Sequence, residues 1–228
     1  MRIALRLVPG ALALLQLGCS ACDETPEETA SESVVFLGID GLDPRLLRGL
    51  LRDSPDDFPH LLRLSEEGFF IDLKVSRTPI LSPILWASMS TGYTEKNHGI
   101  QSWTANRQAP VSQTDLYASR FWEAGSEQGR SVLQVGSLMT SPVVPLNGVN
   151  VGDVFSWSYL NDGANLSSHV YPEDRVESFS ALVPGPTWMQ ESPYVGNQLT
   201  YIEARHHPML ADESFLRIFE STWPTQHF

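Results

Sequence analysis

Ser82 occupies a position at which its hydroxyl could bind an anion. Pro83 follows it directly, and the residues from there to Thr91 are mostly good helix formers. A proline suits the first turn of a helix because it has no N–H to lose, so the pattern predicts a helix with Ser82 as its N-cap. Free backbone N–H groups and the positive end of the helix dipole meet there, which makes the position a seat for a phosphate group. The alternative is that Ser82 only caps the helix.

Asp40 is the second residue with chemical potential. The apolar run that starts at Val34 ends in Asp40-Gly41. A run that is apolar on both alternating faces predicts a strand buried in a mostly parallel sheet. Open α/β sheets place their ligand sites beyond the carboxyl ends of the strands, so Asp40 is expected at such an edge. An aspartate there could equally be the cap of the next helix, and this alternative stays open.

The segments around these residues alternate between helical and extended patterns, which favours an α/β fold. Residues 156–205 are rich in Pro, Gly, Ser and Trp and are expected to form a cap or an insertion on the substrate side. The patterns predict helices over 43–51, 57–67, 115–127 and 212–222, and extended segments over 34–41, 69–75, 131–136 and 149–155.

Composition excludes several classes of function. The chain has 228 residues and a formal net charge of −12, which argues against a nucleic-acid-binding surface. Both cysteines, Cys19 and Cys22, lie near the N-terminus. The rest of the chain therefore has no disulfide framework, cysteine nucleophile or thiolate metal site.

The first 22 residues have the pattern of a secretory signal, with Arg2 and Arg6 at the start and an apolar stretch behind them. The ending resembles a bacterial lipoprotein signal, in which Cys19 or Cys22 would be acylated; an ordinary cleaved signal is the alternative. Residues 23–33 are acidic and predict a disordered linker. The protein is expected to be exported, as a periplasmic or membrane-anchored lipoprotein of a bacterium that meets the membrane only through a lipid anchor.

Several motifs occur in an order that resembles the alkaline phosphatase superfamily, and specifically its type I phosphodiesterase/nucleotide pyrophosphatase branch. The similarity covers roughly residues 34 to 220. It implies a layered α/β/α fold with a mostly parallel central sheet, of which residues 34–228 would be an incomplete, N-terminal part. The motifs are Gly38-Ile39-Asp40-Gly41, Ser82-Pro83-x-x-Trp86-Ala87-Ser88-x-x-Thr91-Gly92, His98-Gly99-Ile100, Trp122-x-x-x-Gly125, Val132–Gly136, Pro145-x-x-Gly148 and Tyr171-Pro172.

The resemblance also implies a reaction. Members of this family use two divalent metal ions, usually zinc, to hydrolyse phosphate mono- or diesters of small molecules through a covalent phospho-enzyme. Asp40 matches a metal-binding aspartate, and Ser82 matches the nucleophile that also contacts the metals. Metal coordination makes a serine hydroxyl acidic enough to act as an alkoxide.

Other polar residues are weaker candidates. In this family the position of His98 is not a metal ligand, so its imidazole is expected to have a structural role. His206 and His207 are sequence neighbours whose side chains point apart, and are expected at the surface. Asp153 is expected at a strand end, and Asp162 in a turn with the glycine after it.

The remaining metal ligands of the family include an Asp-His-Gly element in the second half of a longer chain, and nothing here matches it. We therefore expect an N-terminal portion of such an enzyme, whose hydrolysis would need the missing half. The alternatives are an inactive fragment or surface binding module, and a transferase that uses the same nucleophile. A sulfatase is disfavoured, because Ile84 and Trp86 stand where its proline and arginine would be.

Overall fold

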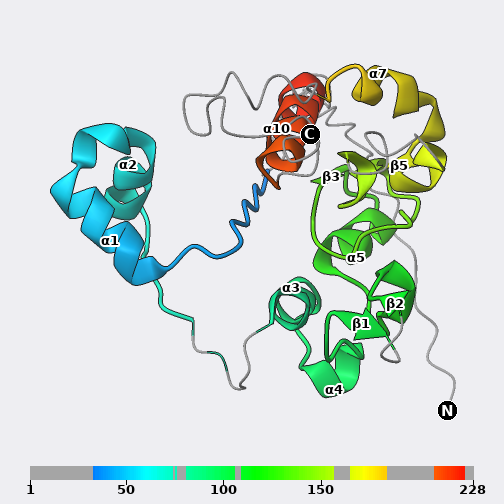
Figure 1. Cartoon of the computed structure of the whole chain (residues 1–228), viewed down its shortest axis with the longest axis horizontal. Coiled ribbons are helices and arrows are strands. Elements are labelled where there is room, and N and C mark those ends of the chain that lie inside the picture. The colour runs from blue at the N-terminus through cyan, green and yellow to red at the C-terminus, as the bar shows by residue number, and fades with distance from the viewer. Residues whose placement is uncertain are drawn as a thin grey trace, which may run out of the picture. The chain divides into compact units, whose positions relative to one another are not determined.

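The computed structural model describes residues 33–73, 75, 81–105, 109–156, 165–183 and 208–223. The chain divides into two units, Met1–Val34 and Val35–Phe228, and every element below lies in the second (Figure 1). The helices are α1 (Pro44–Asp53), η1 (Pro55–Asp57), α2 (Pro59–Glu67), α3 (Ser82–Thr91), α4 (Glu95–His98), η2 (Gln113–Asp115), α5 (Phe121–Glu127), η3 (Leu166–His169), η4 (Glu173–Arg175), α7 (Val176–Ser180) and α10 (Pro208–Thr222). The strands are β1 (Thr104–Ala105), β2 (Ala109–Pro110), β3 (Val132–Val135), β4 (Gly148–Val151) and β5 (Val170–Tyr171).

The described strands form two small sheets. In the larger one, with the order β3-β4-β5, β3 and β4 run parallel and pair Val132 with Gly148. β5 is antiparallel to β4 and pairs Val170 with Val151. The smaller sheet is the antiparallel pair β1-β2. This is a mixed α/β fold, consistent with a partial alkaline-phosphatase-like domain.

The main hydrophobic core lies against the larger sheet. Val149 and Val151 of β4 pack with Phe155, with Phe179 of α7 and with Ile218 of α10, which is fully buried. α10 contacts β3, and Figure 1 shows the two elements next to each other. These apolar side chains come from segments far apart in the sequence, so their burial holds the sheet and its helices together.

A second core cluster supports α3. It consists of Ala87 of α3, Ile100 after α4, and Met139 after β3, all buried, with Val111, Leu116 and Leu138 packed against them. α3 also contacts α4 and α5. The helix that carries Ser82 is therefore fixed through its middle and its C-terminal half.

Several predicted elements are confirmed. α1 and β3 lie where the patterns place them, and the extended segment over 149–155 contains most of β4. α10 ends at the predicted residue but begins at Pro208, four residues before the predicted start. The helix predicted over 57–67 is wrong at its start, because α2 begins only at Pro59. The residue before a proline is pushed out of the α region, and Phe58 has φ −131° and ψ 47°.

The helix predicted over 115–127 is also wrong in its first half. Asp115 ends η2, and α5 begins at Phe121. Leu116 is extended, with φ −88° and ψ 128°. The N–H of Tyr117 donates to the carbonyl of His98 at 3.0 Å, and this tertiary hydrogen bond holds the segment after η2 in its non-helical conformation.

The prediction of strands over 34–41 and 69–75 is wrong. Neither segment forms a strand in its described residues, and Phe36 and Phe69 are exposed. Apolar composition predicts burial, whereas a strand also needs a neighbour to bond its N–H and C=O groups. No described strand supplies one. Within the described ranges, no helix has both the length and the apolar character needed to cross a bilayer.

Candidate functional site

α3 begins at Ser82, but Ser82 is not its N-cap. Leu81 is the N-cap, with φ −123° and ψ 132°, and its carbonyl accepts from the N–H groups of Ile84 and Leu85 at 3.1 Å each. The prediction was wrong by one residue. Pro83 is tolerated as the second helical residue because the first N–H groups of a helix have no intrahelical partner. The Ser82 hydroxyl is consequently not used to cap the helix.

The Ser82 hydroxyl instead donates a hydrogen bond to the carboxylate of Asp40. The Oγ of Ser82 donates to Oδ2 of Asp40 at 3.2 Å, although 42 positions separate the residues in sequence. The indole Nε1 of Trp86 donates to the other carboxylate oxygen, Oδ1, at 3.1 Å. The structure therefore brings together the two predicted site residues and adds Trp86. Asp40 is exposed and Ser82 half-buried, so a substrate from solvent can reach both.

His98 has a structural position, as expected. Its side chain is fully buried, its Nδ1 accepts from the N–H of Ile100 at 3.1 Å, and its Nε2 lies 3.0 Å from the Oγ of Ser88. Because Nδ1 accepts, the neutral ring carries its proton on Nε2 and donates it to Ser88. Nε2 then has no lone pair for the serine proton, so the two residues do not form a nucleophile and base.

Acidification should reduce stability through His98. Burial lowers the pKa of His98 below its ordinary value of 6.5. Between about pH 6.5 and the lower folded pKa, the unfolded chain binds a proton that the folded chain resists, so the free energy of unfolding falls as pH drops through this window. Burial lowers the pKa of His169 in the same direction. Hydrogen bonds from Arg45 lower the pKa of Asp43 to about 2. This carboxylate is therefore protonated, and its contribution to the free energy of unfolding lost, only at lower pH.

Urea unfolding between about pH 8 and about pH 5 measures this effect. In His98→Asn, the side-chain carbonyl can still accept from Ile100 but does not titrate, so the slope should become shallower. A wild-type stability that is constant or rises toward about pH 5 would contradict the assignment.

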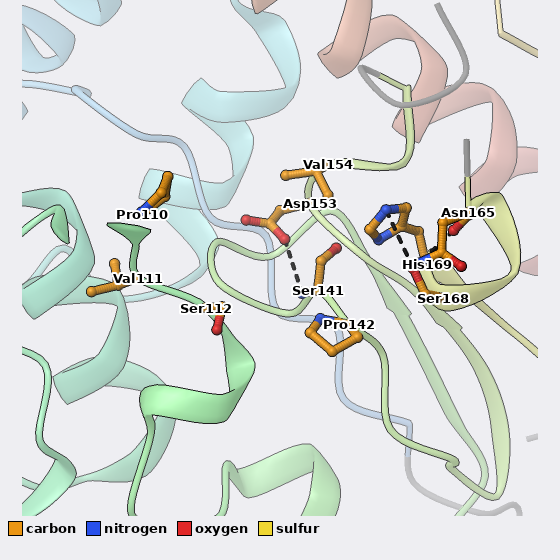
Figure 2. Close-up of a pocket in the computed structure, with 10 residues that line it drawn as sticks. All are labelled: Pro110, Val111, Ser112, Ser141, Pro142, Asp153, Val154, Asn165, Ser168 and His169. Atoms are coloured by element: carbon orange, nitrogen blue, oxygen red, sulfur yellow. Dashed lines mark hydrogen bonds between the residues drawn. The ribbon is translucent and has the colours of Figure 1, made fainter. Parts of the chain in front are cut away.

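A separate cavity of about 360 Å³ lies around the turn after β4 (Figure 2). Asp153 borders it, but its carboxylate accepts the N–H groups of Met139, Thr140 and Ser141 at 2.8, 3.2 and 3.1 Å. This aspartate therefore fixes a turn, where Met139 has φ 62°, and the prediction of a polar strand-end residue is refined. The lining is Pro110, Val111, Ser112, Ser141, Pro142, Asp153, Val154, Asn165, Ser168 and His169, without Asp40 or Ser82.

The described residues do not fit a complete two-metal centre. A catalytic zinc ion takes three protein ligands, whereas the site contributes the oxygens of Asp40 and Ser82. Among the residues that the structure describes, no group of three or more His, Cys, Asp or Glu could hold a metal ion. His206, His207 and Asp162 lie outside the described residues. The arrangement can present a hydroxyl to an electrophile and accept its proton on Asp40.

Comparison with known proteins identifies the family of this chain. The model of a family described as type I phosphodiesterase / nucleotide pyrophosphatase matches residues 34–197, which is more than two thirds of the chain. The matched region contains Asp40, Ser82 and Trp86. No curated protein and no solved structure matches the chain.

Proposed function

Because the chain belongs to the type I phosphodiesterase/nucleotide pyrophosphatase family, we propose that it takes part in the hydrolysis of phosphodiesters or nucleotide pyrophosphates with Ser82 as nucleophile. Membership of this family implies hydrolysis of this type. Our proposal is the assignment of the chemical steps to Ser82 and Asp40. The observation that carries it is the 3.2 Å hydrogen bond from the Ser82 hydroxyl to Asp40, which joins two family motifs at one exposed point. The substrate is a small phosphate ester.

In the proposed first step, the Oγ of Ser82 attacks phosphorus while its proton passes to Oδ2 of Asp40. The bond from phosphorus to the leaving oxygen breaks. That oxygen takes a proton from solvent and departs as an alcohol, because in-line displacement places it on the side of phosphorus opposite Ser82 and Asp40. Water then attacks the phosphoserine from that opposite side and releases a proton to solvent, while Asp40 still holds the proton from Ser82. The Ser82 oxygen leaves as the second product forms, and takes the proton back. Asp40 thus acts as general base and general acid in turn.

The family typically uses metal ions, and the resemblance implies two divalent ions, usually zinc, that Asp40 and Ser82 would bind. A metal ion on Asp40 would take the place of the proton on Oδ2 and would itself make the Ser82 hydroxyl acidic. Such a centre needs further ligands beyond these two residues, so no step is assigned to it. A layered α/β/α arrangement and export as a periplasmic or lipid-anchored protein remain part of the proposal.

Replacement of Asp40 by asparagine tests the proposal. Asparagine keeps the size of the side chain but is a poor proton acceptor, so kcat/KM should fall by about two to four orders of magnitude. The assay follows hydrolysis of bis-p-nitrophenyl phosphate by the purified chain with zinc in the buffer. Asp56→Asn, at an exposed residue of η1, is the matched control and should keep wild-type activity. Equal activity of Asp40→Asn and wild type would refute the role of Asp40.

A non-catalytic surface binding module is the second candidate. It is favoured by the lack of a three-residue metal cluster among the described residues. This candidate predicts no turnover by wild type with zinc, together with retained binding of a non-hydrolysable phosphodiester in calorimetry. The proposed steps use only Ser82 and Asp40. The hydrolase proposal therefore departs from the expectation that further metal ligands are required, and it predicts turnover by this chain, so one preparation distinguishes the two candidates.

A further inference from the structure

We propose that Trp86 is a positioning residue that holds the Asp40 carboxylate against Ser82, an inference that rests on the proposed function. The carboxylate receives one donor on each oxygen. The indole Nε1 lies 3.1 Å from Oδ1 and the Ser82 Oγ lies 3.2 Å from Oδ2. A carboxylate with a single donor can rotate about its terminal bond, whereas two donors on different oxygens define its plane. The indole thereby leaves Oδ2 directed to the nucleophile.

The spacing of the donors explains why one helix can supply both. Ser82 and Trp86 are four residues apart in α3, and side chains at i and i+4 lie on the same helical face. The two donors therefore move together as a rigid unit. The core contacts of Ala87, which is buried next to Trp86 in sequence, fix the rotation of this face.

Gly38 provides the space in which the indole lies. A Cβ at this glycine would overlap the six-membered ring of Trp86. Its φ lies outside the left-handed region, so the requirement is for close approach of the ring to the backbone and not for an unusual backbone conformation. The ring thus packs against the chain two residues before Asp40, while its N–H binds the Asp40 side chain. Packing and hydrogen bonding act on the same segment.

These contacts matter because the Asp40 segment has no sheet to hold it. Residues 33–39 form no strand, and Val35, Leu37 and Ile39 are exposed. The edge-to-face contact of Phe36 with Phe121, whose ring centroids are 5.5 Å apart, is another anchor on this segment. The position of Asp40 relative to Ser82 therefore depends on Trp86 and a few side-chain contacts.

An NMR experiment tests the contact without requiring activity. In wild type labelled with ¹⁵N at tryptophan, Trp86→Phe identifies the Nε1–H resonance of Trp86 by its loss. Asp40→Asn should move this resonance upfield, because a neutral amide oxygen is a weaker acceptor than a carboxylate. Asp56→Asn should leave it in place. If Asp40→Asn leaves the resonance unmoved while the spectrum remains that of a folded protein, the positioning role of Trp86 is overturned.

Kinetics tests the consequence of the contact. Trp86→Phe keeps an aromatic side chain on this face of α3 but lacks the N–H and the outer ring atoms that approach Gly38, so kcat should fall about 10- to 100-fold with KM changed by less than about three-fold. Gly38→Ala keeps every polar group and should lower kcat by displacing the ring. Trp103→Phe, at a half-exposed tryptophan, is the control. A wild-type kcat in Trp86→Phe would overturn the inference, whereas an inactive wild type with the NMR shift present would refute only the proposed hydrolysis.

Discussion

Ser82→Ala is expected to lower kcat/KM for bis-p-nitrophenyl phosphate by about four to six orders of magnitude, which is the scale seen when a nucleophile is deleted. The substitution removes the Oγ that would form the bond to phosphorus and leaves the helix intact, because Ser82 does not cap α3. The next serine along α3 cannot take over, since the Ser88 hydroxyl lies 3.0 Å from Nε2 of the buried His98.

Matched variants separate chemistry from stability in this assay. Ser178→Ala removes an exposed helical hydroxyl that donates to the carbonyl of Arg175 at 2.9 Å, and it should keep wild-type kcat/KM. Ser82→Thr retains a hydroxyl and should retain part of the activity. Turnover in Ser82→Ala within about ten-fold of wild type would show that another group is the nucleophile.

Arg120→Met is expected to lower the free energy of unfolding by about 3–5 kcal/mol, because it leaves the largely buried carboxylate of Glu123 without its charged partner. The Arg120 side chain is 1% exposed and its Nη1 lies 3.0 Å from Oε1 of Glu123, whose side chain is 13% exposed. The same guanidinium donates to the side chain of Gln113 and to the carbonyl of Met139. It therefore joins η2, α5 and the turn after β3.

Thermal unfolding measures this loss, which corresponds to a fall in Tm of roughly 6–20 °C for a chain of this length. Arg45→Met is the control, because the Arg45 side chain is 88% exposed, and its effect should stay within about 0.5 kcal/mol. Adding Glu123→Gln to Arg120→Met should recover part of the stability, since no unpaired charge then remains. A double variant that is no more stable than Arg120→Met would contradict this explanation.

Local sequence patterns predicted the elements whose boundaries depend on local chemistry. α1 begins after Asp43, whose carboxylate accepts the N–H groups of Arg45 and Leu46, and such a cap is visible in sequence. Pro59 also carried a usable signal, because it disfavours helix at Phe58. By contrast, nothing local marks the break before α5, where residues 116–120 contain neither glycine nor proline and tertiary hydrogen bonds decide the conformation.

The site was predictable for a different reason. The order of the motifs predicted that Asp40 and Ser82 belong to one site. The structure places them within hydrogen-bond distance, although the buried strand expected to carry Asp40 is not formed. Trp86 was quoted in a motif without a role; its i+4 spacing from Ser82 was the available signal. The role of Gly38 depends on a ring 48 positions away in sequence, so no local pattern could have identified it. Burial of Arg120 is likewise a property of the assembled fold.

Trapping of the phospho-enzyme tests whether Ser82 is the nucleophile. The purified chain is mixed with bis-p-nitrophenyl phosphate and zinc, quenched in acid during turnover, digested with trypsin and analysed by fragmentation mass spectrometry. Trypsin releases the peptide Thr78–Lys96, which contains Ser82. We expect a p-nitrophenyl phosphate adduct on Ser82 of this peptide, and its absence in Ser82→Ala. An adduct on any other residue, or turnover with this peptide unmodified, would contradict this expectation.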